Sequence, residues 1–163
     1  MSSKNYWTLV LPVIFITAFY YLSKSIDKSL NLPKIPININ LITYVLILVG
    51  TILVISVFYF FITFGKGTPV PKQLTNKLIT KKLVVKGPFK YTRNPMAIGF
   101  FLILFGMAFY YKSYSLLFLT AIMAIIGHLF IVHIEEKDME QRFGKSYLEY
   151  KKKVPRWMLK FHS

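Results

Sequence analysis

The sequence contains no cysteine, which excludes disulfides, thiolate metal sites and a cysteine nucleophile. Acidic residues are also scarce. The chain has 6 Asp or Glu and 21 Lys or Arg, which gives a net charge of +15. Such a balance is known from nucleic-acid-binding proteins, but here the basic residues border apolar runs instead of forming one soluble face. Contact with anionic lipid headgroups explains them better. We therefore expect a chain in contact with a bilayer and no nucleic-acid partner.

Apolar residues are abundant, at 55% of the chain, and the mean hydropathy is +0.50. They are concentrated in four runs, at residues 6–22, 41–64, 95–111 and 115–134. The second run has no charged residue and is long enough to span a bilayer. Only residues 112–114 separate the last two runs, which predicts a tight helical hairpin. The pattern predicts an all-α polytopic membrane protein with about four transmembrane helices, forming a single membrane domain over residues 1–163.

The distribution of basic residues predicts the orientation in the membrane. Residues 65–93 contain eight Lys or Arg and no acid, and the tail from Glu135 onward contains eight more. The segments between the other runs contain few basic residues. Because basic loops stay in the cytoplasm, we expect the long loop and both termini to be cytoplasmic.

The tail has one apolar stripe at the helical period, followed by a proline that would end a helix: Met139, Phe143, Tyr147, Tyr150, Val154 and Pro155. Its lysines lie off that stripe. The pattern predicts a C-terminal amphipathic cytoplasmic helix that rests on the inner leaflet or caps the bundle.

Polar features at the cytoplasmic ends of the last two runs are the candidate ligand site. Glu135 and Glu136 follow the fourth run, and a solvated helical turn is the plainest interpretation of the pair. A carboxylate here also suits a ligand with an ammonium group or a vicinal diol. Gly87 and the prolines of residues 88–95 break helical continuity before the third run, where an ordinary entry turn into the helix is one interpretation. Non-helical backbone at this depth is tolerated mainly when it lines a cavity or is buried in protein.

Other kinds of site find little support. His128 and His133 are five residues apart and do not share a helical face, so we expect no metal. No Ser/His/Asp grouping and no GxxxxGK[ST] phosphate loop is visible. The sequence therefore assigns no catalytic acid, base or nucleophile.

The second half of the chain resembles the superfamily of isoprenylcysteine carboxyl methyltransferases and phospholipid methyltransferases, which are integral membrane enzymes. The shared elements occur in order: Leu83-Val84, Gly87-Pro88-Phe89, Arg93-Asn94-Pro95-Met96, Glu135-Glu136, Phe143-Gly144, Tyr147, Tyr150 and Val154-Pro155. The resemblance covers about residues 65–156. It implies two N-terminal transmembrane helices in residues 1–64 and a methyltransferase core in residues 65–163.

The resemblance implies S-adenosylmethionine as the cofactor and a lipid or lipid-like methyl acceptor, either a phospholipid amine or a prenylcysteine-type carboxylate. The implied cofactor-binding residues are Lys81, Lys82, Leu83, Val84, Gly87, Phe89, Arg93, Asn94, Pro95, Met96, Ala97, Glu135 and Glu136. His128 and Ile131 are candidate substrate contacts. Asn94 stands where many members have His, and Ala97 where Tyr is common. Ile131 replaces an arginine that prenylcysteine enzymes use for the substrate carboxylate.

Two alternatives remain open at this point. One is an NADPH-dependent sterol- or enone-type membrane reductase, because some such enzymes are similar in the C-terminal region. The other is a non-enzymatic lipid-binding membrane protein. No obligate protein partner is indicated, so we expect the bilayer and a lipid substrate to be the chain's partners.

Overall fold

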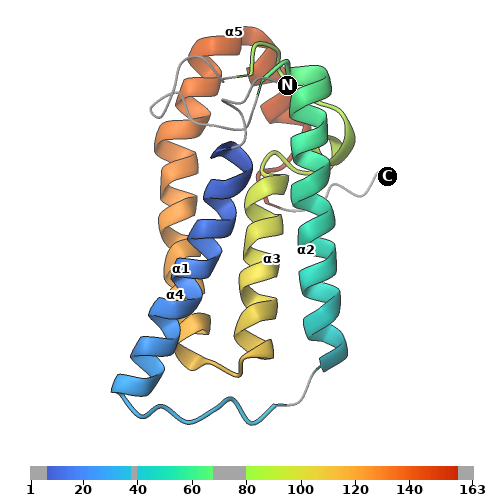
Figure 1. Cartoon of the computed structure of the whole chain (residues 1–163). Helices are drawn as coiled ribbons and strands as arrows, with labels where there is room; N and C mark the ends of the chain where they lie inside the picture. Colours follow the sequence, from blue (N-terminus) through green and yellow to red (C-terminus); the bar gives the residue numbers. More distant parts are fainter. Residues whose placement is uncertain (1–6, 38–39, 68–79, 158–163) are drawn as a thin grey trace. The chain divides into compact units, whose positions relative to one another are not determined.

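The computed structural model describes residues 7–37, 40–67 and 80–157, and the regular structure in these ranges is entirely helical. Five α-helices follow one another in these ranges (Figure 1): α1 (Trp7–Ser29), α2 (Asn40–Phe60), α3 (Pro95–Tyr110), α4 (Tyr114–Phe130) and α5 (Glu136–Lys153). Two π-helical turns, η2 (Phe61–Gly65) and η4 (Ile131–Glu135), extend α2 and α4, and a short 3₁₀ helix, η3 (Gly87–Lys90), precedes α3. The all-α prediction is confirmed for the described residues.

The four apolar runs correspond closely to α1–α4, with one notable difference. α1 continues to Ser29, seven residues beyond the end of the first run, through the polar residues Lys24 and Asp27. Two helical segments, Asn40–Gly65 and Tyr114–Lys153, are long and apolar enough to cross a membrane, and Pro95–Tyr110 is a shorter apolar helix. The number of spans stays a prediction.

The chain divides into two compact units. One contains Met1–Val49 with Phe101–Ala124, and the other contains Gly50–Phe100 with Ile125–Ser163. Each unit therefore combines sequence from both sides of residue 64, and neither coincides with the expected ranges 1–64 and 65–163. The single-domain organisation stays a prediction.

The first unit has a small core and a capped helix start. Phe19 of α1 packs with Leu104, Ala108 and Leu116 of α3 and α4. The Asp27 carboxylate accepts hydrogen bonds from the Ser113 hydroxyl and the Ser115 amide, and the Ser113 hydroxyl accepts one from Leu116 N–H. The first N–H groups of α4, which have no partner within the helix, are satisfied in this way.

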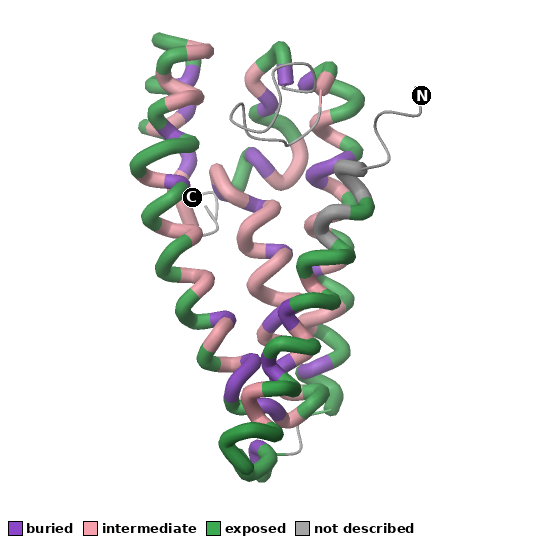
Figure 2. Tube along the Cα trace, turned by 60° about the vertical axis from the view of Figure 1, so that its left-hand side comes forward, coloured by how far each residue is buried: buried purple, intermediate pink, exposed green. Residues whose placement is uncertain are grey.

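The second unit has a core to which the C-terminal tail contributes half of the buried residues: Val57, Val84, Phe89, Tyr147, Tyr150 and Val154. Met139 and Phe143 pack against this cluster, so the predicted apolar stripe covers a protein core. The helix ends at Lys153, two residues before Pro155, as predicted. Gly144 interrupts it with a left-handed φ of 52°, which the periodicity did not predict. Buried positions alternate with exposed ones along the helices (Figure 2).

Candidate functional site

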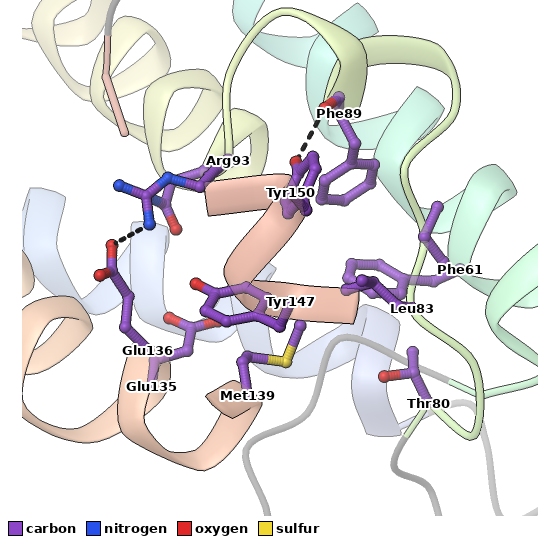
Figure 3. Close-up of a pocket in the computed structure, with 12 residues that line it drawn as sticks. Phe61, Thr80, Leu83, Phe89, Arg93, Glu135, Glu136, Met139, Tyr147 and Tyr150 are labelled. Atoms are coloured by element: carbon purple, nitrogen blue, oxygen red, sulfur yellow. Dashed lines mark hydrogen bonds and ion pairs between the residues drawn. The ribbon is translucent and has the colours of Figure 1, made fainter. Parts of the chain in front are cut away.

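A small cavity in the second unit brings together residues from five segments of the chain (Figure 3). Its lining is Phe61, Thr80, Leu83, Val84, Phe89, Arg93, Asn94, Glu135, Glu136, Met139, Tyr147 and Tyr150. The cavity volume is about 50 Å³. Apolar and aromatic side chains form most of its wall, and charged groups are confined to Arg93, Glu135 and Glu136. This combination of an apolar wall with a few polar groups is typical of a ligand site.

Two π-helical turns border the cavity. η2 supplies Phe61 and η4 supplies Glu135. A π-turn inserts an extra residue into a helix and rotates the side chains that follow, and such turns occur often at functional sites. In η4 the turn ends at Glu135, and Glu136 is the first residue of α5, which continues the helix directly.

The turn before α3 depends on Gly87, whose φ of +60° is a left-handed conformation. A Cβ atom at this position would also overlap the ring of Phe60. The following 3₁₀ helix buries Phe89, and the Phe89 carbonyl accepts a 2.7 Å hydrogen bond from the Tyr150 hydroxyl. Gly87 therefore shapes the backbone, and the adjoining residues bind the tail to the loop.

Glu136 is the centre of a buried ionic cluster. Its side chain is 4% exposed, and its oxygens lie 2.6 Å from Arg156 Nε, 3.1 Å from Lys151 Nζ and 2.9 Å from Arg93 Nη1. The ion pair with Arg156 is strong because both carboxylate oxygens of Glu136 accept a hydrogen bond from its guanidinium. Burial alone would raise the pKa of Glu136, but hydrogen bonds from Arg156 and Lys151 and the nearby Arg93 charge lower it to about 2. Glu136 is therefore ionised and bound within the protein at neutral pH.

Arg93 keeps unused hydrogen-bonding capacity. Its side chain is only 8% exposed, yet Nε and Nη1 have no hydrogen-bond acceptor among the described residues. The contact between Nη1 and Glu136 is close enough for an ion pair but lacks the direction of a hydrogen bond. The Glu136 charge compensates Nη1, whereas Nε is a buried donor at the cavity wall with no acceptor in the described chain, which is costly. A ligand oxygen is favoured beside Nε.

Glu135 differs from its neighbour. It is an exposed residue that also lines the cavity, and it has no hydrogen bond or ion pair within residues 7–37, 40–67 and 80–157. Figure 3 shows Glu136 directed at Arg93, whereas the Glu135 carboxylate lies apart from that pair. The two adjacent acids therefore have different roles: Glu136 holds the basic residues of the protein, and Glu135 is available to a ligand.

The segment after α5 returns to the start of α3. The Arg156 carbonyl accepts hydrogen bonds from the Thr92 hydroxyl at 2.9 Å and from the Asn94 side-chain amide at 3.2 Å. The Pro155 carbonyl accepts one from the Arg93 amide at 3.0 Å. Asn94 thus has a structural hydrogen bond as well as a place in the cavity wall.

The structure brings seven of the thirteen sequence-predicted cofactor contacts to the cavity wall: Leu83, Val84, Phe89, Arg93, Asn94, Glu135 and Glu136. Lys81 and Lys82 are exposed, and their amides bond to the Gly65 carbonyl. Four other predicted contacts do not line the cavity, although they are close in sequence to residues that do: Gly87, Pro95, Met96 and Ala97. Of the two candidate substrate contacts, Ile131 is buried and His128 accepts a 2.9 Å hydrogen bond from Trp157 Nε1. Neither lines the cavity.

Sequence reasoning missed other lining residues as ligand contacts, namely Phe61, Thr80, Met139, Tyr147 and Tyr150. The last three belong to the apolar stripe of the tail, which predicts a helix that rests on the inner leaflet or caps the bundle and gives no signal for a ligand. Arg156 and Lys151 were not singled out, and only their contacts with Glu136 reveal their role.

The chain was compared with known proteins. A family model described as phospholipid methyltransferase matches residues 39–146, which is more than half of the chain and includes every charged residue of the cavity. No curated protein and no solved structure gives a significant match. The length of the family match and the helical fold lead to one conclusion: the chain belongs to the phospholipid methyltransferase family, a family of membrane methyltransferases.

Proposed function

We propose that this chain is an integral membrane methyltransferase that uses S-adenosylmethionine and methylates a lipid or lipid-like substrate. The family membership and the two long apolar helices support this proposal. The observation that carries it is the presence, at one cavity, of a buried guanidinium whose Nε has no acceptor and of a carboxylate without a partner in the described chain.

These two groups fit the amino-acid end of S-adenosylmethionine, which bears one carboxylate and one ammonium. Arg93 would pair with the carboxylate through Nε, its buried donor without an acceptor, and the planar donor fork of a guanidinium suits a planar anion. Glu135 would pair with the ammonium or accept bonds from the ribose hydroxyls. The Phe61, Phe89 and Tyr147 rings offer faces for the adenine and for the positive sulfur.

The predicted contacts that do not line the cavity would then act through the backbone shape of the loop or through contacts made on ligand binding. They are Lys81, Lys82, Gly87, Pro95, Met96 and Ala97. A cavity of about 50 Å³ is far below the several hundred Å³ of ordinary cofactor sites. Binding therefore requires the lining segments to move apart. Glu136 and the basic side chains around it would stay together, because their ion pairs form without the ligand.

The bound cofactor would supply an activated methyl group on a positively charged sulfur. Transfer to a nucleophile is an in-line displacement, so alignment is the protein's main contribution. Arg93 and Glu135 would fix one end of the cofactor, and the aromatic wall would exclude water from the reacting centre. No acid–base pair is needed when the acceptor is a carboxylate, whereas an amine acceptor must first lose a proton.

Ile131 favours the amine over the carboxylate acceptor. It is buried and apolar at the position where prenylcysteine enzymes have an arginine. We propose four spans with both termini in the cytoplasm, where the basic loop and tail face the inner leaflet. The lipid would then reach the site from the bilayer, with no obligate protein partner.

Isothermal titration of the purified full-length protein with S-adenosylhomocysteine tests this function. Glu135→Gln should weaken binding at least tenfold, since a charge-assisted bond contributes about 1.5–3 kcal/mol. Arg93→Lys should weaken it as well, because lysine keeps the charge but loses the fork. Lys145→Gln, which changes the charge by one unit at an exposed position outside the cavity, is the matched control.

No binding of S-adenosylhomocysteine to the unmodified protein would overturn the proposal, and so would equal affinities of Glu135→Gln and the control. A radiolabelled methyl-transfer assay in native membranes, with products separated by lipid class, would identify the acceptor.

A further inference from the structure

A second, larger cavity lies in the first unit, and none of its residues belongs to the cavity described above. Its volume is about 380 Å³, within the range of small-molecule sites. It is bounded by the end of α1, the segment that follows it and the turn between α3 and α4. Four lysines line it: Lys24, Lys28, Lys34 and Lys112.

The backbone around this cavity is held in place by specific contacts. Asn31 ends α1 in a left-handed conformation with a φ of 47°, and the Leu32 amide bonds to the Asp27 carbonyl at 3.0 Å. The buried Ile35 then donates its amide to the Lys112 carbonyl at 3.0 Å. The segment after α1 is thereby joined to the α3–α4 turn, and the four lysines are kept around a common space.

The charge of the cavity is uncompensated. Asp27 is the only acid in its lining, so four amino groups less one carboxylate leave a charge of +3. Both Asp27 oxygens are already used, one by the Ser113 hydroxyl and the other by the Ser115 amide. None of the four lysines has an ion-pair partner among the residues that the structure describes. Like charges gathered in this way favour binding of an anion.

Two tyrosines line the cavity, and two more continue the group of rings. The Tyr20 and Tyr111 rings line it, with centroids 4.3 Å apart, and Tyr110 contacts both Tyr111 and Tyr44. Tyr110 and Tyr44 are more than half exposed. Exposed tyrosines grouped in this way on apolar helices mark the membrane–water interface. In a bilayer, an interfacial position of these tyrosines would place the lysines near the lipid phosphates.

We propose that this cavity binds a phosphate-bearing anion, with the phosphate of a lipid headgroup or of a soluble phosphate ester held among the four lysines. Amino groups act as point charges for a phosphate, and the tyrosine rings flank the rest of the headgroup. The site is independent of the proposed methyltransferase function.

Native mass spectrometry of the full-length protein in detergent micelles tests the proposal, with phosphatidylglycerol as the probe and phosphatidylcholine as the zwitterionic comparison. The variant Lys28→Gln/Lys112→Gln should bind phosphatidylglycerol roughly 25-fold more weakly, at about fivefold for each lysine removed. Lys145→Gln/Lys152→Gln removes the same charge from exposed positions of α5 and should bind like the unmodified protein.

Competition by glycerol 1-phosphate would show that the headgroup phosphate alone is recognised, whereas binding without competition would show that the intact lipid is required. Both results support a phosphate site. Equal binding by the two double variants, or equal affinity for the two lipids, would overturn it. S-adenosylhomocysteine affinity should be unchanged in Lys28→Gln/Lys112→Gln, so failure of one proposal is distinguishable from failure of the other.

Discussion

Replacing Glu136 with glutamine tests the buried ionic cluster most directly. The substitution keeps the size of the side chain and one acceptor oxygen, but it removes the charge shared by Arg93, Lys151 and Arg156. Arg93, with a side chain only 8% exposed, would then lose its buried counter-charge. Arg156 and Lys151 are more exposed and would be solvated more easily.

The size of the effect follows from the pKa of Glu136. It falls from an ordinary value of 4.5 to about 2, and each pKa unit corresponds to about 1.4 kcal/mol. The charged form therefore contributes about 3 kcal/mol to stability at neutral pH. Removing one partner of a buried ion pair costs roughly 3–5 kcal/mol in other proteins, which agrees in size. We expect Glu136→Gln to lower the free energy of unfolding by about 3 kcal/mol.

Equilibrium unfolding in mixed detergent micelles at pH 7 measures this loss. Glu140→Gln is the matched control, because Glu140 lies on the same helix and its side chain is 34% exposed, with Lys151 as its one ion-pair partner among the described residues. An exposed pair contributes at most about 1 kcal/mol. A loss in Glu136→Gln no larger than that in Glu140→Gln would refute the assignment of Glu136 as the centre of the cluster.

The pH dependence provides a second check with a definite sign. Because folding lowers the pKa of Glu136, its contribution is fully present above about pH 4.5 and is lost as the pH falls toward about 2. The unmodified protein should therefore lose stability across that window. Glu136→Gln should lose less over the same range, and an unchanged acid slope in the variant would contradict the reasoning.

Three further substitutions test other contacts by the same unfolding assay. Gly87→Ala should destabilise the protein by more than 1 kcal/mol and impair S-adenosylhomocysteine binding, because alanine resists the left-handed φ and its Cβ would overlap Phe60. Tyr150→Phe should cost about 1 kcal/mol through loss of the hydrogen bond to the Phe89 carbonyl, and no change would contradict that role. Asp27→Ala should cost about 1 kcal/mol by removing a cap from α4, with cofactor binding unchanged.

Parts of the site could be predicted from local sequence because they depend on local chemistry. The glycine and prolines of residues 87–95 forbid a continuous helix, so a loop at the start of α3 was expected. The residues of that loop, together with the acids after the fourth apolar run, include every charged member of the cavity wall. The apolar stripe of the tail predicted a helix that ends before Pro155, and the structure confirms it.

The sequence by itself determined the helical class, the positions of the apolar runs and the place where polar groups interrupt them. These properties follow from residue hydrophobicity and from backbone restrictions, which act over a few residues. Only the tertiary structure decided that Glu136 is bound by Arg156 while Glu135 has no such partner in the described chain, and that Asp27 caps α4. Adjacent helical residues point about 100° apart, so each meets different partners from distant parts of the chain, and no local pattern records which partners those are.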